Sequence, residues 1–441
     1  MGAGTALAAP LLAGGRARAA PLADVDVVVI GAGISGLAAA RALGGMGYEV
    51  VVLEARDRIG GRLYTDRGLG APFEVGAGWI HGPDGNPISE LARRAGGRTF
   101  VTDDDSFQVF RADGSPVPRG EVEQGWGRLE RLFGRIDARF EPDLPLARAV
   151  QRVQPGARDD ALLQWMLSAY TEFDTGGPLE RLSAYYFDED SAFDGADVVL
   201  TNGYDLVLKP LARGLDIRLG NRVTRIEYEE GDGASVYAGK ARYDASFVIC
   251  TLPLGVLKAG AVTFDPPLPR DHRNRISRLG MGNVTKLAMR FDAPYWPVDT
   301  QYFGLMTKER GRWNYFLNYR TFSDANILLG LSVGAYAGKV ERLTDAAMLA
   351  DGMKAVRRMF GSQVPAPNAH RLTRWSRDPF SLGAYSYSRV GATPADFDDL
   401  ARPVAGTLLL AGEHTLFKYH ATMHGAYLSG LRAARQVDDL A

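Results

Sequence analysis

The strongest pattern of apolar and polar positions runs from Val27 to Glu54. A β-branched run, VVVI, is followed by the glycine-rich stretch GAGISG, an Ala/Leu-rich stretch, and a second apolar run, YEVVVLE. Short runs rich in Val predict strands, whereas the Ala/Leu-rich stretch predicts a helix. The segment therefore predicts a strand, a helix and a second strand, which together form a βαβ unit.

Later segments alternate between the helical and the extended periodicity. Residues 89–180 carry apolar positions three and four apart, as in WGRLERLFGRIDARF, and this spacing predicts helices. Residues 266–400 alternate strand-like runs such as KLAMRFD and NILLGLSVG with one helical stretch, DAAMLADGMKAVRRMF. Near the C-terminus, TLLLAGEHT predicts a short buried strand that leads into a closing helix, MHGAYLSGLRAARQV.

These elements predict a fold of mixed class, α/β and α+β. Because 441 residues are many for a single hydrophobic core, we expect two domains. A Rossmann-like domain would be discontinuous and would consist of residues 24–85, 198–260 and 402–441. The other residues, 86–197 and 261–401, would form a substrate-binding domain with a mixed β-sheet and helices. The site is expected at the seam, where strand ends meet the crevice between the domains.

Composition narrows the class of protein. The hydrophobic content of 46%, the charged content of 23% and the net charge of −1 are typical of a globular enzyme and argue against nucleic acid or an anionic membrane as partner. No apolar stretch is long enough to predict a membrane span. Cys250 is the only cysteine, which excludes an internal disulfide and a cysteine-based metal cluster. A monomer and a homodimer are not distinguished.

Residues 1–23 are left out of the predicted fold. They are rich in Ala, Gly and Leu and contain Ala-Arg-Ala at Ala17–Ala19, like the apolar and cleavage regions of an export signal, although a basic start is missing. Two interpretations stay open. The segment is either a remnant of an export signal, for a periplasmic or secreted protein, or a disordered tail, for a cytoplasmic one.

The glycine-rich stretch has the spacing Gly31-x-Gly33-x-x-Gly36 and lies between a predicted strand and a predicted helix. In a dinucleotide-binding turn, the first glycine permits the tight turn, the second lets the backbone approach a pyrophosphate, and the third lets the helix pack on the strand. Glu54, 18 residues after Gly36, stands where an acid accepts hydrogen bonds from a ribose. The pattern predicts dinucleotide binding without choosing between NAD and FAD.

Four separated motifs carry a resemblance to a known family. They are GAGISGLAAARAL with EARDRIGGR, GAGWIHGPDGNP, MGNVTKLAMRFDAPYW, and LAGEHTLFKYHATMHGAYLSGLRAA. In order, spacing and type they resemble the flavin-containing amine oxidases, closest to polyamine and spermine oxidases and to lysine-specific-demethylase-like amine oxidases, over residues 25–437. The resemblance implies a flavoprotein whose cofactor is FAD, bound by the discontinuous Rossmann-like domain.

The resemblance also implies a role for each cofactor-binding residue. Glu54 would hold the adenosine ribose, and Arg62 would reach the pyrophosphate and flavin region. Val223 would contact adenine through its backbone, and Glu413 would bind the ribityl or pyrophosphate part. Met423, at the start of the closing helix, would direct its N–H and the helix dipole at the flavin C2 oxygen.

Three residues are the candidates for the chemistry. By resemblance, Lys286 holds a water against flavin N5, and Tyr385 faces the substrate nitrogen. His81 lies in a glycine-rich loop and matches an active-site histidine of spermine and acetylpolyamine oxidases, so we expect it to contact substrate or handle a proton.

The substrate pocket is expected to include Thr422, Phe380 and Trp375. Monoamine oxidases carry an aromatic residue where this chain has Thr422, and this departure favours a polyamine-oxidase or demethylase-like type. Core packing is the alternative for Phe380 and Trp375. No metal is expected: although His414, His420 and His424 lie close in sequence, HExxH is absent and their turn matches the flavin motif.

The predicted function is oxidation of a polyamine by O2 to an aldehyde, a shorter amine and hydrogen peroxide. Alternatives are oxidation of another primary or secondary amine or an amino acid, and a flavin-bound redox or binding protein without turnover. A histone demethylase would need a helical tower and a chromatin-binding module, which 441 residues do not accommodate. Acids that would line a polyamine tunnel, or form a solvated loop instead, are Glu172, Asp174, Asp188, Glu189, Asp190, Asp194 and Asp197.

Overall fold

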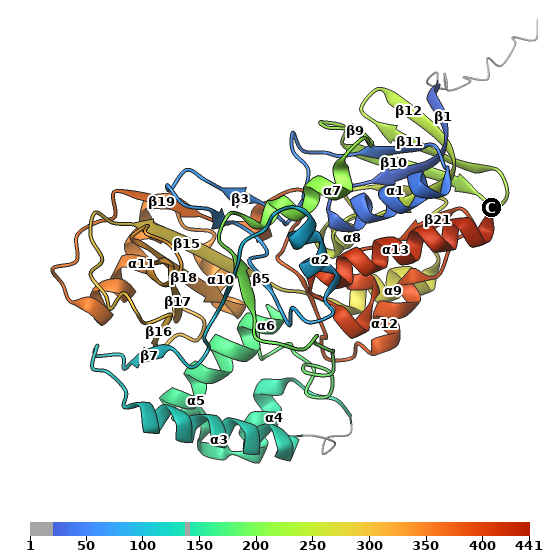
Figure 1. Ribbon diagram of the computed structural model, residues 1–441. Helices are drawn as coiled ribbons and strands as arrows, with labels where there is room; N and C mark the ends of the chain where they lie inside the picture. The colour runs from blue at the N-terminus through green and yellow to red at the C-terminus, as the bar shows by residue number, and fades with distance from the viewer. Residues whose placement is uncertain (1–20, 137–141) are drawn as a thin grey trace, which may run out of the picture.

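The computed structural model describes residues 21–136 and 142–441 (Figure 1). Most of the predicted N-terminal tail lies outside the described residues, so its interpretation as an export signal or a disordered tail stays a prediction. Strand β1 begins at Pro21. In the described part of the chain, no helix is both long and apolar enough to cross a membrane.

An eight-stranded sheet organises the first of two units (Figure 1). Strand β1 (Pro21–Ile30) lies parallel between β12 (Ala241–Cys250) and β2 (Val50–Leu53). The predicted βαβ unit is therefore present, with α1 (Ile34–Met46) as its helix. The sheet also contains β9 (Asp216–Arg218), β10 (Val223–Glu229), β11 (Gly233–Ala238), β13 (Thr263–Asp265) and β21 (Leu408–Leu410).

The second unit is built on a six-stranded mixed sheet. Its order is β19 (Ala369–Leu372), β15 (Val284–Arg290), β18 (Ile327–Val333), β17 (Tyr315–Asn318), β16 (Tyr302–Leu305) and β7 (Phe107–Phe110). All pairs are antiparallel except the parallel pair of β16 and β7. Strand β18 is buried along its whole length, as expected for a strand covered on both faces.

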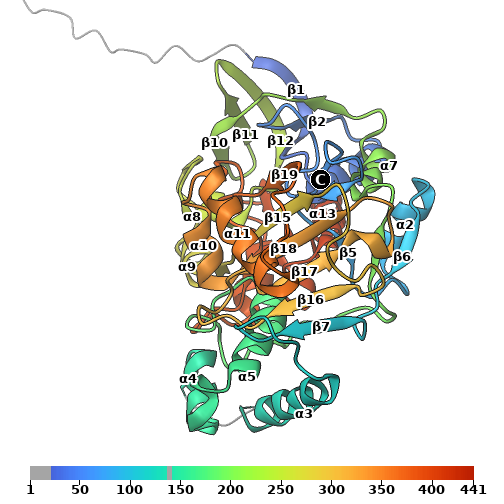
Figure 2. The ribbon, with the colours of Figure 1, turned by 90° about the vertical axis from the view of Figure 1, so that its left-hand side faces the viewer.

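Helices cover both sides of the second sheet. On one side lie α10 (Gly334–Val340) and α11 (Asp345–Phe360), seen in front of the strands in Figure 2. On the other side lies a layer of α3 (Arg119–Ile136), α4 (Leu146–Val153) and α5 (Ala161–Met166). A Rossmann-like unit joined to a mixed sheet with helices confirms the predicted fold class.

Several segments that the predicted boundaries placed in the substrate-binding domain pack on the first unit. Strand β13 pairs with β10, and α2 (Pro87–Arg94) packs against α13 (Met423–Leu440). Helices α9 (Arg270–Arg278) and α12 (Pro394–Asp398) bury apolar residues against the same sheet. The chain therefore crosses between the units more often than the predicted boundaries allow.

Helices α1 and α13 cross closely because Gly430 of α13 faces the backbone of α1. A Cβ added at Gly430 would lie 2.1 Å from the carbonyl oxygen of Ser35 and 3.2 Å from the Cβ of Ala38. A methyl group there must push the helices apart. Since α1 begins at the glycine-rich turn and α13 ends the chain, this crossing fixes two remote segments against each other.

Gly430→Ala should lower the free energy of unfolding by about 1–3 kcal/mol, because it overpacks a backbone contact between helices. The matched control is Gly44→Ala in α1, where an added Cβ meets nothing within 4 Å. The control should gain about 0.5–1 kcal/mol from its better helix propensity. Urea unfolding of both variants tests this, and equal stabilities would contradict the close approach at Gly430.

Candidate active site

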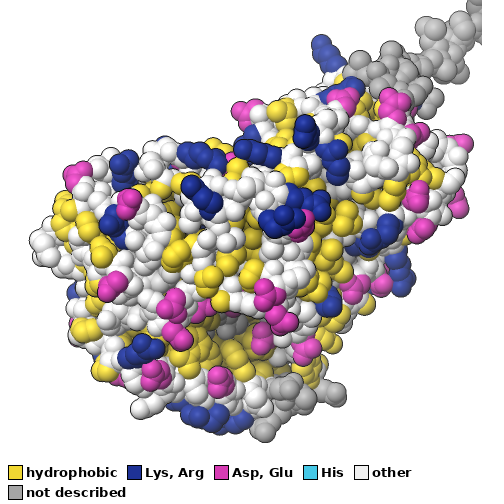
Figure 3. Space-filling view, in the orientation of Figure 1, with side chains coloured by type: hydrophobic (Ala, Val, Ile, Leu, Met, Phe, Trp, Pro, Cys, Tyr) yellow, Lys and Arg dark blue, Asp and Glu magenta, His cyan; other side chains and the backbone are white. Residues whose placement is uncertain are grey.

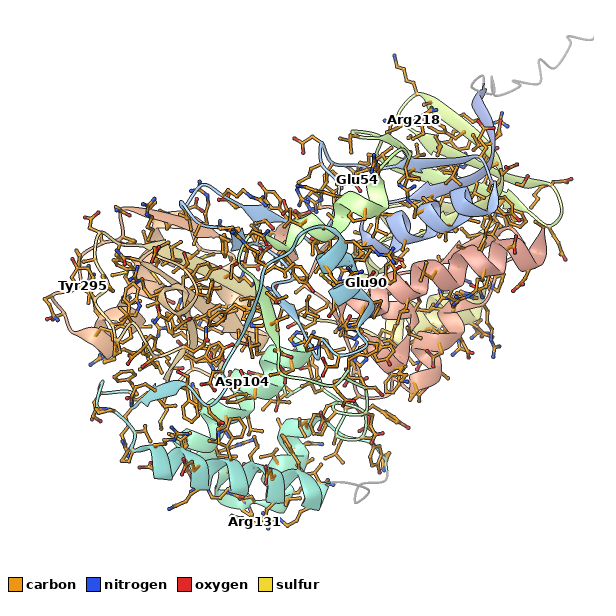
Figure 4. The ribbon with its side chains drawn as sticks, in the orientation of Figure 1. Glu54, Glu90, Asp104, Arg131, Arg218 and Tyr295 are labelled. Carbon is orange, nitrogen blue, oxygen red and sulfur yellow. The ribbon has the colours of Figure 1, made fainter. Side chains whose placement is uncertain are left out.

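A cavity of about 980 Å³ extends between the two units. Figure 4 marks both parts of its lining, with Glu54 in the first unit and Asp104 in the second. The volume is at the upper end of the range of about 300–1,000 Å³ that is usual for ligand pockets. It is therefore large enough for an extended dinucleotide together with part of a small second molecule.

The glycine-rich turn forms one wall of the cavity. A Cβ at Gly31 would lie 2.6 Å from Thr251 Oγ1, and one at Gly36 would lie 2.0 Å from the Gly31 carbonyl oxygen. At Gly33, in contrast, a Cβ would meet no atom within 4 Å, so this glycine faces open space. Gly33 is also the N-cap of α1 and offers no side chain to the first N–H groups of the helix. The turn thus fits an anionic pyrophosphate.

Glu54 ties the glycine-rich turn to the end of β2. One carboxylate oxygen accepts a hydrogen bond from the Ala32 N–H at 2.8 Å, and the other accepts one from the Arg56 N–H at 2.8 Å. Each oxygen retains a second lone pair, and the residue lines the cavity. These free lone pairs could accept hydrogen bonds from the hydroxyls of a ribose.

Both carboxylate oxygens of Glu413 accept hydrogen bonds from other residues of the chain. Its Oε1 accepts from Arg62 Nη1 at 2.9 Å, and its Oε2 accepts from the N–H and hydroxyl of Ser386 and from the Ala421 N–H. Burial alone would raise the pKa of Glu413, but the Arg62 charge and these hydrogen bonds lower it to about 2. The carboxylate therefore positions Arg62, which also donates to the Ala384 carbonyl at 2.8 Å.

Thr422 is the N-cap of α13. Its hydroxyl accepts from the Gly425 N–H at 3.0 Å and donates to the Tyr419 carbonyl at 2.8 Å. The threonine lines the cavity, yet its polar group is used within the chain. Met423, the first residue of the helix, also lines the cavity. The first N–H groups of a helix have no intrahelical partner, so they suit a polar or anionic group of a ligand.

Lys286 lies on β15 and is almost completely buried, with 5% exposure. Its ammonium group donates to the carbonyls of Glu74 at 2.9 Å and Gly76 at 2.7 Å and lies 5.5 Å from the ring centre of Trp79. Burial lowers its pKa to about 8, against the opposing charge of Glu74. An ammonium group has three donors, so one is left for a water or a ligand in the cavity.

Tyr385 is positioned by a glycine and a carbonyl group. Its hydroxyl donates to the Phe173 carbonyl, and its ring packs on Gly176, where a Cβ would come within 2.8 Å. Gly176 has a φ of +65°, so glycine is needed there for its conformation as well as for its size. Burial raises the pKa of Tyr385, so this phenol stays neutral.

Trp375 and Phe380 occupy different parts of the cavity wall. The indole N–H of Trp375 donates to the Val75 carbonyl at 3.0 Å. The next residue in that loop is Gly76, whose carbonyl accepts a hydrogen bond from the Lys286 ammonium group. Phe380 instead lies 5.1 Å from the guanidinium of Arg56 and 5.7 Å from that of Arg222. Phe380 therefore lies beside arginine side chains of the cavity wall, and one of these, Arg56, follows Glu54 closely in the chain.

His81 forms a pair with Asp197. Its Nδ1 lies 2.5 Å from Asp197 Oδ2, and Asp197 Oδ1 also accepts from the Gly82 N–H. Burial lowers the pKa of His81, but the contact with Asp197 and the charges of Asp174 and Asp104 outweigh it and raise the pKa overall. The contact with Asp197 therefore favours the protonated form of the histidine.

An aromatic wall that sequence reasoning missed lines the cavity beyond Tyr385. Phe173 stacks on Tyr315 with ring centres 5.7 Å apart, and Tyr315 stacks on Tyr302 at 5.1 Å. The wall continues through further edge-to-face contacts of Trp79, Trp126 and Tyr170. Aromatic residues scattered over several elements give no local signal of this kind.

Acids gather in the same half of the cavity. Of the seven acids proposed from the sequence, four line it, namely Asp174, Asp188, Asp190 and Asp197, and they are joined there by Asp104 and Glu130, which the sequence did not single out. Glu172 instead is buried in an ion pair with Arg310 at 3.1 Å. Figure 3 shows a hollow on the molecular surface with apolar side chains inside and acidic side chains beside it.

Glu74 is another residue that the sequence did not single out. Its buried carboxylate accepts from Thr65 Oγ1 at 2.7 Å and from the Tyr204 N–H at 2.9 Å, and burial raises its pKa to about 7. The only sign of Glu74 in the sequence is that an acidic residue stands between two apolar residues in Phe-Glu-Val. As for metals, no three His, Cys, Asp or Glu side chains of the described residues are grouped as a metal site requires.

Glu413→Gln should lower the free energy of unfolding by about 1.5–3 kcal/mol, because it replaces the charge-assisted hydrogen bond between buried Glu413 and partly buried Arg62 with a weaker, neutral one. The depressed pKa of Glu413 means that its carboxylate stabilises fully above about pH 4.5, with this contribution lost as the pH falls toward 2. Wild-type stability should therefore fall more steeply across that window than the stability of the variant.

Asp205→Asn is the control, because it removes an ion pair with Arg67 that is partly exposed. It should change the free energy of unfolding by less than about 1 kcal/mol. Denaturant titrations between pH 2 and pH 6 check both variants. A loss at Glu413→Gln no larger than that of the control would rule out the structural role.

The chain matches proteins of known class. A family model described as flavin containing amine oxidoreductase matches residues 34–438. Over 436 residues the chain is 35% identical to "Lysine-specific histone demethylase 1 homolog 2" of Arabidopsis thaliana, an alignment that covers 93% of the chain but 58% of that relative. It is 33% identical over 435 residues to "Probable polyamine oxidase 4" of Arabidopsis thaliana, covering 93% of the chain and 86% of that relative.

A solved structure shows the same fold. Putrescine oxidase, as wild type bound to putrescine, superposes with a TM-score of 0.77 at 23% identity, covering 95% of the chain and 99% of that structure. The predicted family, oxidoreductase class and FAD cofactor are confirmed by these matches. The chain belongs to the family of flavin-containing amine oxidoreductases.

Proposed function

We propose that the protein is a polyamine oxidase that uses FAD and O2 to produce an aldehyde, a shorter amine and hydrogen peroxide. The observation that carries this proposal is that positively and negatively charged side chains line different parts of the cavity. In the part that contains the glycine-rich turn, the cavity is lined by Arg56, Arg62 and Arg222. The part beyond Tyr385 has the aromatic wall and the six acids.

The second part of the cavity suits a flexible aliphatic polycation. Carboxylates attract ammonium groups, and aromatic faces accept both cations and the methylene groups between them. A neutral aromatic monoamine would leave most of these acids without a counter-charge. The relative named as a polyamine oxidase supports the same substrate class.

The residues of the first part would hold FAD. We assign the ribose of the adenosine to Glu54, the pyrophosphate region to Arg62 and the N-terminus of α1, adenine to the backbone at Val223, and the flavin end to the N-terminus of α13 at Met423. Phe380 would lie at the adenosine end and not in the substrate pocket. Bound FAD supplies the chemistry, accepting a hydride equivalent from the carbon next to the amine nitrogen.

The chain's own side chains would prepare the amine. The nitrogen must be neutral when the adjacent C–H bond breaks, because its lone pair assists the transfer. His81 with Asp197 offers a group for the released proton, and Tyr385 provides a neutral aromatic wall for the uncharged amine. Trp375 and Thr422 would shape the pocket by fixing the loop at Val75 and the start of α13.

A substrate panel tests the function. The purified holoenzyme should form hydrogen peroxide with spermine, spermidine or acetylated polyamines at a kcat/KM at least about 10-fold higher than with aromatic monoamines, which corresponds to about 1.4 kcal/mol. Putrescine and lysine-containing peptides complete the panel. A preference for an aromatic monoamine or a peptide would overturn the polyamine assignment but leave the amine oxidase class intact.

Lys286→Met should lower turnover by roughly 100-fold, because its ammonium group holds a water at the reacting end of the cavity. FAD should stay bound, which the flavin absorbance of the purified variant checks. Because burial places the pKa of Lys286 at about 8, the lysine is charged below pH 8 and neutral above it. A step in the wild-type rate near pH 8 should be missing in the variant.

Lys258→Met is the matched control. Desolvation lowers the pKa of Lys258 to about 8 as well, and its ammonium group donates to the carbonyls of Ile276, Ser277 and Leu279. Unlike Lys286, however, Lys258 is an exposed residue and does not line the cavity. This variant should retain turnover and the step near pH 8. If both variants lose activity alike, the effect of Lys286 is structural.

A further inference from the structure

A second, much smaller cavity also borders Lys286. Its volume is about 30 Å³, and the charged side chains that line it, among the described residues, are those of Lys286 and Glu74. The remaining walls are mostly apolar and include Trp79, Leu317 and Leu329. Glu74 lines this small cavity and not the large one, so it approaches Lys286 from the side away from the large cavity.

Gly78 lies between the side chains of Glu74 and Lys286. A Cβ added at Gly78 would lie 3.8 Å from Glu74 Cγ and 3.6 Å from Lys286 Nζ. The three heavy atoms nearest to that point all belong to Glu74 and Lys286. The carboxylate and the ammonium group are therefore neighbours in buried, mostly apolar surroundings, where opposite charges attract each other more strongly than in water.

The carboxylate of Glu74 accepts hydrogen bonds from neutral donors, Thr65 Oγ1 and the Tyr204 N–H, and forms no ion pair with any of the described residues. It is only 8% exposed, and a buried carboxylate is costly unless a positive charge offsets it. The charge of Lys286 lowers the pKa of Glu74, whereas that of Asp205 raises it. Glu74 in turn is the charged group that raises the pKa of Lys286.

The backbone around Glu74 holds the same ammonium group. Lys286 Nζ donates to the carbonyls of Glu74 at 2.9 Å and Gly76 at 2.7 Å. Tyr204, whose N–H binds the Glu74 carboxylate, donates its hydroxyl to the Trp79 carbonyl at 3.0 Å. Tyr204 therefore fixes the segment Glu74–Trp79 at both ends, and this segment supplies the acceptors that orient the lysine.

On the basis of the proposed function, in which Lys286 acts at the reacting end of the large cavity, we infer that Glu74 is the positioning residue of Lys286. Its carbonyl orients the ammonium group, and its carboxylate supplies the counter-charge that keeps this group protonated. Glu74 does not line the large cavity, so it acts through Lys286 and not on the substrate. Loss of its charge should therefore alter the pH dependence of the rate but not the choice of amine.

Glu74→Gln tests this inference through the pH profile of the holoenzyme. Glutamine has the same shape and can still bind Thr65 and Tyr204, so the substitution removes the charge alone. Without that charge nothing opposes the effect of burial, and the pKa of Lys286 should fall. The step in the rate, expected near pH 8 in the wild type, should move to about pH 7 or below. The relative kcat/KM values of different amines should stay the same.

Glu341→Gln is the matched control. Glu341 is another buried acid, bonded to Thr285 Oγ1 at 2.9 Å next to Lys286 in the chain, but it lines neither cavity. This variant should keep the step near pH 8. Glu74→Asp retains the charge on a shorter side chain and should place the step between those of the wild type and Glu74→Gln. A step that stays near pH 8 in Glu74→Gln, or one that moves equally in Glu341→Gln, would overturn the inference.

A stability measurement separates this inference from the proposed function, because it requires no turnover. Glu74→Gln, Lys286→Met and the double variant are unfolded with urea at about pH 7.5 and about pH 10. At the lower pH the double variant should lose less stability than the two single variants together, because each single variant leaves one buried charge unpaired. At the higher pH Lys286 is neutral, so the losses should add. Additive losses at both pH values would overturn the inference. If no amine is oxidised, the function fails while this comparison still decides the role of Glu74.

Discussion

The ion pair between partly buried Arg62 and buried Glu413 is the interaction on which the cavity depends. It joins the loop after β2 to the segment before α13, and the same carboxylate holds Ser386 and Ala421. Removing a carboxylate from water is costly unless it is paired and hydrogen-bonded, and here donors from three remote segments of the chain bind its two oxygens. One ionised group therefore holds together segments that line both parts of the cavity.

Ala421 shows how tightly this arrangement is constrained. Its φ of +63° is uncommon for a residue with a Cβ, and its N–H is one of the donors to Glu413. The strained turn places Thr422 as the cap of α13 and so sets where the first N–H groups of that helix lie. Strain at one residue thus aligns a helix terminus with the cavity.

Much of the first unit could be predicted from the sequence because its signals are local. The glycine spacing, the two Val-rich runs and Glu54 all lie within one βαβ segment, and the structure has them there. Thr422 also has a local signal for its position at the start of α13, since threonine is a preferred N-cap. The position of β13 in the first sheet had no such signal, because it depends on pairing with β10.

The aromatic wall and the position of Phe380 could not be predicted for a related reason. Tyr302 and Tyr315 lie on neighbouring strands, and Phe173 comes from a helical segment far away in the chain, so their stacking exists only in the folded protein. Phe380 lies in a loop, and its ring is close to the guanidinium groups of Arg56 and Arg222, which come from two other segments of the chain. Sequence spacing says nothing about such contacts.

Burial sets the charge state of the whole cavity. It raises the pKa of Asp174 to about 7 and lowers that of Lys286 to about 8, so burial disfavours the charged form of both side chains. A cation close to Asp174 would lower the pKa of that acid again. Arrival of a polycation would therefore extend the pH range in which Asp174 is anionic while Lys286 is cationic, although neither side chain contacts the other.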